Sequence, residues 1–181
     1  MTRTSGRALR PGFDDLEGRH LLSTLSPVGR SLQGNPRSAQ LIAAASVQPS
    51  FQPGIYFLRD RQTNLNLDSN AARAIYTNNY NGGRYQRWEF RPSGDGSTFF
   101  IRDVATNFYL DGRGSPHHMK VDDFSGSDYQ RWRLFPSGDG YYVLQNKKTG
   151  LFLDSNADGA VYQLPYNGGR YQQWQLTATT P

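Results

Sequence analysis

Two strings in the sequence place the same polar side chains at the same spacing. Residues 67–88 read LDSNAARAIYTNNYNGGRYQRW, and residues 153–174 read LDSNADGAVYQLPYNGGRYQQW. Asp accepts charge-assisted hydrogen bonds from neighbouring hydroxyls, Asn both donates and accepts, and Tyr offers a flat apolar face with a polar tip. A molecule with vicinal hydroxyls and a patch of C–H groups would meet all three. This chemistry indicates binding of a neutral sugar.

Other chemistries find little support in the sequence. There is no Cys, and the only Glu residues are Glu17 and Glu89, so acid–base catalysis would have to rely on Asp. No Ser–His–Asp order, phosphate-binding glycine loop or nucleophile elbow is present. The pair His117-His118 does not predict a metal site, because adjacent residues of a strand point to opposite faces. The acidic cluster at 122–128 lacks the spacing of a calcium loop, so we expect no metal and no cofactor.

The polar strings belong to a threefold repeat. Trp88, Trp132 and Trp174 end the strings YQRW, YQRW and YQQW, and three LD strings recur with the same spacing of 42–44 residues. The repeats are predicted at 54–93, 94–137 and 138–178, within a domain covering 54–181. We call them unit one, unit two and unit three.

Each unit contains four short runs rich in Tyr, Phe, Val, Ile and Leu, bounded by Gly, Asn, Asp and Pro, which predict strands. No helical apolar stripe is present in this region. A propeller needs at least four blades, whereas three four-stranded units fit a β-trefoil, a six-stranded barrel capped by three hairpins. The fold class is therefore expected to be all-β. The three Trp are expected in the core, and the Gln two residues before each is expected to satisfy buried backbone groups.

The first 53 residues differ in composition from the rest. Of 24 aromatic residues, 23 lie after position 50, and residues 1–50 carry six Arg against three acids. We expect a basic segment and a Ser-, Pro- and Gln-rich linker over 1–53, mostly disordered. The string at 16–23, LEGRHLLS, resembles an element near the N-termini of some bacterial surface and exported proteins, so we expect a secreted, extracellular or cell-surface bacterial protein.

Charge and hydropathy limit the partners. Residues 51–181 carry 14 basic and 12 acidic side chains, which argues against nucleic acid because phosphate binding needs a concentrated basic face. The longest apolar run, 41–47, is far shorter than the roughly 20 residues of a membrane span. We expect a monomer whose partners are glycans.

The Q-x-W strings and the longer pattern around them resemble the ricin-B-type β-trefoil lectins, in particular small bacterial members that bind high-mannose glycans. The resemblance implies a pocket in each unit with an Asp, a Tyr eight residues on, an apolar residue at ten, an Asn at thirteen and a Tyr at seventeen. In unit three these are Asp154, Tyr162, Leu164, Asn167 and Tyr171. In unit one they are Asp68, Tyr76, Asn81 and Tyr85, with Asn78 at the apolar position.

Unit two departs from the family pattern. It keeps Asp111 and Tyr129 but has one extra residue between them, and Lys120, Asp122 and Ser125 replace the Tyr, the apolar residue and the Asn. This weaker candidate pocket is expected to be impaired or changed in specificity, so two mannose sites are predicted rather than three.

The sequence therefore predicts a non-catalytic, multivalent lectin for mannose-type glycans. Three alternatives stay open. Each Asp could be purely structural, capping the turn after its strand. The domain could be a protein-interaction or inhibitor trefoil with a relic sugar motif, since fold alone does not define function. A glycosidase would need a second carboxyl group facing the same bond.

Overall fold

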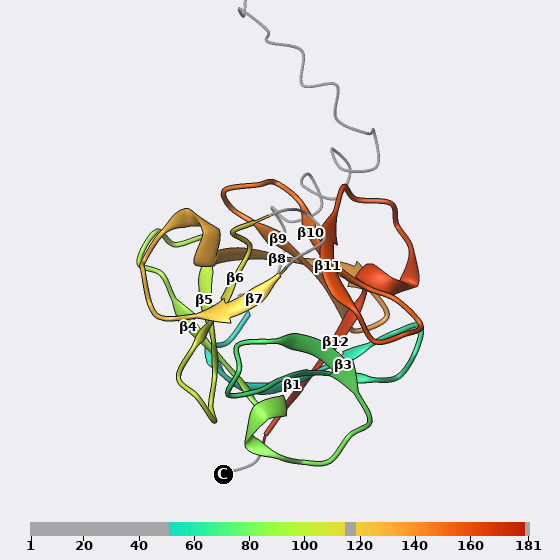
Figure 1. Cartoon of the computed structure of the whole chain (residues 1–181). Coiled ribbons are helices and arrows are strands. Elements are labelled where there is room, and N and C mark those ends of the chain that lie inside the picture. Colours follow the sequence, from blue (N-terminus) through green and yellow to red (C-terminus); the bar gives the residue numbers. More distant parts are fainter. Residues whose placement is uncertain (1–50, 115–118, 180–181) are drawn as a thin grey trace, which may run out of the picture. The chain divides into compact units, whose positions relative to one another are not determined.

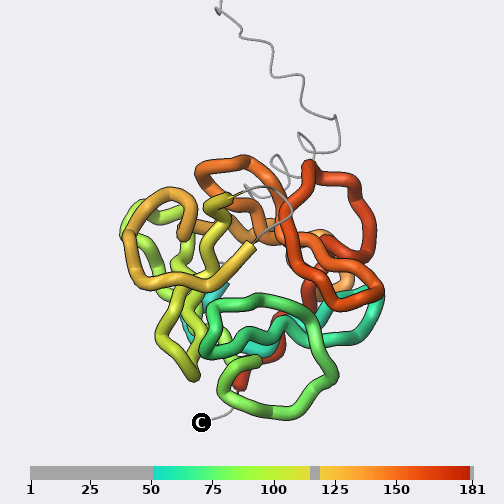
Figure 2. Tube along the Cα trace, viewed as in Figure 1, coloured from blue at the N-terminus to red at the C-terminus, as the bar shows by residue number. Residues whose placement is uncertain are grey.

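The computed structural model describes residues 51–114 and 119–179 (Figure 1). The expectations for residues 1–50 and for His117-His118 concern residues outside these ranges. The described chain is all-β with twelve strands, apart from three single 3₁₀ turns, which confirms the predicted fold class. Figure 2 shows the three units as successive lobes around a common centre.

Six strands form a closed barrel, because each pairs with the next and the last pairs with the first. The antiparallel order is β1–β4–β5–β8–β9–β12–β1. Closure leaves no open edge in the barrel, and an open edge would invite pairing between chains. The strands are β1 (Gly54–Asp60), β4 (Trp88–Pro92), β5 (Phe99–Asp103), β8 (Arg131–Gly138), β9 (Tyr141–Asn146) and β12 (Trp174–Ala178).

The remaining six strands form one hairpin in each unit. They are β2 (Asn66–Ser69) with β3 (Ile75–Asn78), β6 (Tyr109–Asp111) with β7 (Lys120–Asp122), and β10 (Phe152–Ser155) with β11 (Val161–Leu164). A 3₁₀ turn follows each hairpin: η2 (Arg84–Gln86), η3 (Asp128–Gln130) and η4 (Arg170–Gln172). A closed barrel with three hairpins is the β-trefoil that the repeat predicts.

One apolar core joins barrel and hairpins. Trp88, Trp132 and Trp174 have no exposed surface and belong to this core. Each indole Nε1 donates to the carbonyl of the Leu that precedes the unit's LD aspartate, at 3.0–3.3 Å. The large rings therefore bury apolar area without leaving a donor unpaired, and they tie each hairpin to the barrel strand that follows it.

Aromatic rings also pack at the start of the described chain. Phe51, three residues before the predicted domain boundary, lies 5.0–5.7 Å from the rings of Tyr56, Phe90, Phe99 and Tyr142. A tight turn at Asp139-Gly140 joins β8 to β9, with positive φ values of 52° and 78°. This is the conformation that Gly, Asn and Asp tolerate best.

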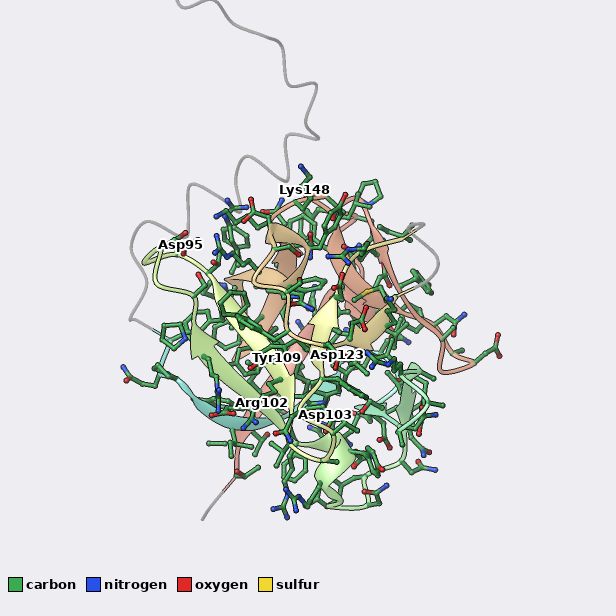
Figure 3. All side chains as sticks on the ribbon, turned by 60° about the vertical axis from the view of Figure 1, so that its left-hand side comes forward. Asp95, Arg102, Asp103, Tyr109, Asp123 and Lys148 are labelled. Carbon is green, nitrogen blue, oxygen red and sulfur yellow. The ribbon has the colours of Figure 1, made fainter. Side chains whose placement is uncertain are left out.

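Buried polar contacts join the units. The Ser69 hydroxyl donates to Asp103 at the end of β5 (Figure 3), and the Ser155 hydroxyl donates to Asp60 at 3.1 Å. At the third junction Asn146 replaces the Asp and Gly112 replaces the Ser. A Cβ on Gly112 would lie 2.6 Å from the Asn146 amide nitrogen, so a side chain there would force Asn146 to move.

Candidate functional site

The structure brings together the residues predicted for the unit-one pocket. They line an open hollow of about 710 Å³. The hairpin supplies Asp68 and Tyr76, the following loop supplies Asn81, and η2 supplies Tyr85. Asn78, predicted at the apolar position, also lines the hollow, together with Ser69, Asn70, Ala71, Ala72 and Gly83.

The hairpin register sets the central pair of this hollow. Asp68 on β2 lies directly opposite Tyr76 on β3, and residues opposite each other in an antiparallel pair point to the same face. The Tyr76 hydroxyl donates to the Ser69 carbonyl at 3.1 Å, which fixes the ring beside the carboxylate. Burial, and then the nearby Asp68 charge, raise the pKa of the Tyr76 phenol, so it remains protonated at neutral pH.

Asp68 lies at the base of the hollow and is only 3% exposed. Its Oδ1 accepts from the Ser69 amide at 2.8 Å, and its Oδ2 accepts from Gln86 Nε2 at 2.9 Å. Asp68 thus supports the local structure, although its partners are the amide of the next strand residue and Gln86, and not the turn after the strand. A carboxylate has about four acceptor positions, so these two hydrogen bonds leave room for ligand hydroxyls.

Gln86 has a second function that the sequence pattern did not reveal. As expected, it satisfies backbone groups: its Oε1 accepts from the Asn81 amide at 3.0 Å, and its Nε2 donates to the Asn79 carbonyl at 2.8 Å. The same Nε2 also holds the Asp68 carboxylate. The fixed spacing of 18 residues between the Asp and the Gln in units one and three was the signal that could have indicated this contact.

The Asn-Gly-Gly loop presents Asn81 at the rim. Asn81 Oδ1 accepts from the Gly83 amide at 2.7 Å. Gly82 has a positive φ of 67°, whereas Gly83 is extended and is needed for space, because a Cβ there would lie 2.7 Å from Asn81 Oδ1. The two glycines thus hold the Asn for different reasons.

Unit three repeats this arrangement. Asp154 lies opposite Tyr162, whose hydroxyl donates to the Ser155 carbonyl at 2.7 Å. Gln172 Nε2 donates to Asp154 Oδ2 at 2.9 Å, and Asn167 Nδ2 approaches the same oxygen at 3.5 Å. Leu164 ends β11, and Tyr171 lies in η4.

The pKa of the Asp154 carboxyl differs from that of an exposed Asp. It is 2% exposed, and burial raises its pKa above the ordinary 3.8, with Asp60 contributing in the same direction. The hydrogen bonds from Gln172 and the Ser155 amide act against this rise. Asp154 therefore binds a proton more readily than a surface Asp.

Unit two keeps the hairpin register and the Asp–Gln contact, which together we call the frame, but the side chains around this frame differ. Asp111 lies opposite Lys120, and Gln130 makes the same bonds to Asp111 Oδ2 and the Ser125 amide, at 3.0 and 2.8 Å. These equivalences agree with the replacements read from the sequence. Lys120 is paired with Asp122 at 2.7 Å, so an ion pair occupies the place of the Tyr.

Tyr129, the remaining unit-two candidate, lies in η3 with the Arg113 guanidinium 5.6 Å from its ring centre. The extra residue of this unit falls in the β6–β7 connection, which includes the four undescribed residues 115–118. Among the residues that the structure does describe, no three His, Cys, Asp or Glu are grouped to hold a metal ion. No helix in the same ranges is long and apolar enough to cross a membrane.

The closed barrel, three hairpins and buried Trp define a β-trefoil. A family model described as "Ricin-type beta-trefoil lectin domain-like" matches residues 84–164 and 128–181. A designed 3-fold symmetric protein, ThreeFoil, is 33% identical, with 70% of this chain and 99% of that chain covered and a TM-score of 0.64. The chain therefore belongs to the ricin-type β-trefoil lectin family.

More distant structures share the fold. SeviL, solved bound to asialo-GM1 saccharide, is 20% identical, with 71% of this chain and all of SeviL covered and a TM-score of 0.61. An exo-β-1,3-galactanase from Clostridium thermocellum is 23% identical with a TM-score of 0.63, and the match covers 72% of this chain and 31% of the enzyme. At these identities the likeness concerns the fold alone.

Proposed function

We propose that the trefoil domain binds mannose-type glycans through the unit-one hollow and through the matching residues of unit three, without turnover. The observation that carries this proposal is the Asp–Tyr pair in the same register in both units, each with an Asn-Gly-Gly loop and a second Tyr. The pattern resembles actinohivin, a small bacterial trefoil lectin for high-mannose glycans, and this resemblance supports the choice of sugar.

The chemistry of the unit-one hollow suits a hexose. Asp68 retains acceptor positions for two hydroxyls, and Tyr85, which is 40% exposed, offers a ring for the C–H face of the sugar. One open hollow of this kind binds weakly, with a Kd in the micromolar to millimolar range, about −8 to −4 kcal/mol. Two such sites on one chain raise avidity for clustered glycans by ~100-fold or more.

The same hollow gives little support to glycoside cleavage. Its lining contains one carboxylate, Asp68, whereas a hydrolytic pair needs two carboxyl groups ~5–10 Å apart across the scissile bond. Non-catalytic binding is the simpler assignment for this arrangement.

The test uses the three units as controls for one another. A mannobiose titration of ¹⁵N-labelled full chain, followed by NMR, should shift the Gly83 and Gly169 amides and leave the Ser127 amide unchanged. Asp68→Asn should remove the first response, and Asp154→Asn the second. Asp111→Asn is the matched substitution in unit two, where the carboxylate accepts from Gln130, and it should leave both sites binding. If both responses persist in the Asp68→Asn, Asp154→Asn double variant, the proposed sites are wrong.

A further inference from the structure

A second hollow lies between unit one and β12 of unit three, and it shares no lining residue with the Asp68 hollow. It has a volume of about 580 Å³ and lies against β1, β12 and the loop that carries Tyr80. Phe57 and Tyr80 form part of its lining, with ring centres 5.1 Å apart, and Tyr80 is 64% exposed.

A missing ring explains why there is space here. In the strand register, Asn66 opposite Arg59 corresponds to Tyr109 opposite Arg102 (Figure 3) and to Phe152 opposite Gln145. The Tyr109 ring packs 4.9 Å from Phe124, and the Phe152 ring packs 5.2 Å from Tyr166. Asn66 has no ring to pack against Tyr80 in this way.

The lining also carries uncompensated positive charge. Arg59 and Arg87 both line the hollow, and no Asp or Glu does. Neither guanidinium forms an ion pair with any described residue. Arg59 donates to the Gln175 side chain at 2.6 Å, Arg87 donates to the Gly82 carbonyl at 3.1 Å, and Arg87 Nε has no partner within the described ranges.

The other two units show that this charge is specific to unit one. In unit two, the equivalent of Arg59 is Arg102, whose Nε donates to Glu89 at 2.7 Å, and the equivalent of Arg87 is Arg131, which pairs with Asp128 at 3.1 Å. In unit three both positions are Gln, at 145 and 173. The frame is therefore compatible with a neutral residue at either position, and only unit one places two unpaired guanidinium groups beside a hollow.

We propose that this hollow binds an acidic saccharide residue, a sugar ring carrying a carboxylate or a sulfate group. Guanidinium groups match the planar or tetrahedral oxygens of such anions. The exposed Tyr80 ring and the Phe57 ring offer an apolar face for the sugar C–H groups, and the exposed Thr177 offers a hydroxyl for hydrogen bonding. The site is separate from the proposed mannose sites and does not depend on them.

The experiment is an NMR titration of the ¹⁵N-labelled full chain with four probes: methyl β-glucuronide, galactose 6-sulfate, neutral methyl β-glucoside and inorganic sulfate. The acidic sugars should shift the amides of Tyr80, Arg87 and Thr177 and bind at least about tenfold more tightly than the other two, because hydrogen bonds to charged groups are the stronger ones. Added salt should weaken the binding of the acidic sugars, because it screens the charges.

Variants that copy the residues of unit three locate the site. Arg59→Gln and Arg87→Gln install the residues found there, and each should weaken acidic-sugar binding about tenfold or more. Asn66→Phe installs the ring of Phe152 and should block the hollow without changing charge. Arg170→Gln removes an exposed charge of unit three and should have no effect.

Three results would overturn the proposal. Equal binding of the neutral glucoside would remove the role of charge. Equal binding of inorganic sulfate would show an anion site without sugar recognition. Unchanged binding in both Arg variants would place the ligand elsewhere, and this outcome decides the matter even if Asn66→Phe fails to fold. Mannobiose is titrated separately and is followed at the Gly83 and Gly169 amides. Failure of the mannose proposal would therefore appear in that titration and not in the acidic-sugar titration.

Discussion

Replacing the Gln of each Q-x-W string by Leu should separate structure from binding. Gln86, Gln130 and Gln172 are fully buried, and each makes three hydrogen bonds of 2.8–3.1 Å. Leu has a similar volume and makes none of them. In each unit the substitution therefore leaves a carboxylate, a carbonyl and an amide without this partner.

The surroundings of the three lost partners determine how much unfolding free energy each Gln→Leu variant should lose. A buried group that loses its partner costs about 1–3 kcal/mol. The carboxylates are buried, but the carbonyl and the amide lie on exposed loops, where water can replace the Gln. We therefore expect each variant to lose about 2–4 kcal/mol of unfolding free energy. Domains commonly have about 5–15 kcal/mol, so the variants should remain folded.

Two assays read the result. Urea unfolding followed by tryptophan fluorescence gives the stability change, which should be similar in all three variants because the bonds are equivalent. Mannobiose titration should lose the unit-one response in Gln86→Leu and the unit-three response in Gln172→Leu, and should keep both in Gln130→Leu. A stability loss below about 1 kcal/mol in all three variants would refute the estimate. Loss of both sugar responses in Gln130→Leu would refute the assignment of sites.

Three further predictions follow from single contacts. Asp154, whose pKa burial raises above 3.8, accepts sugar hydroxyls most strongly when it is ionised, so unit-three binding in an NMR titration should weaken as the pH falls from about 7 towards about 4. The same raised pKa makes this group's contribution to stability largest below its unfolded pKa, and urea unfolding should show that contribution disappear as the pH rises through the folded pKa. Gly83→Ala should displace Asn81 and abolish the unit-one response to mannobiose, at a stability cost of about 1 kcal/mol. Ser127→Ala, at the equivalent position of unit two where a Cβ is already present, should leave that response unchanged and alter the unfolding free energy by no more than about 0.5 kcal/mol. Gly112→Ala should cost about 2 kcal/mol in urea unfolding, since the new Cβ meets Asn146 at 2.6 Å, and a neutral result would show that this junction can relax.

The fold could be predicted because its signals repeat. Each unit carries the same sequence of aromatic runs and Gly, Asn or Asp turns, and twelve short strands in three units leave few closed arrangements. The grouping of Asp68 with Tyr76 was implied only by the family resemblance. In the structure the hairpin register places the two residues opposite each other.

The burial of the site carboxylates could not be predicted from the same spacing. Asp68 and Asp154 are only 3% and 2% exposed, because a Gln that precedes the next barrel strand covers one side of each. The second hollow was also missed. Its space comes from Asn66 lacking a ring. Its unpaired charge stands out only by comparison with unit two, where Glu89 and Asp128 pair with the equivalent arginines, and these neighbours are defined only once the strands are paired.

Unit two shows which part of the repeated pattern carries information about binding. It keeps the hydrogen bond between the Asp and the Gln and the bond from the Trp to the Leu carbonyl, although Lys120 and Ser125 stand in place of the Tyr and the Asn. The Asp–Gln–Trp set thus has a structural purpose in every unit, and an Asp at this position is by itself no sign of a sugar site. The stronger indication comes from the Tyr opposite the Asp and from the Asn held by two glycines. On the proposed assignment, units one and three bind the sugar because of the side chains added to a frame that all three units share.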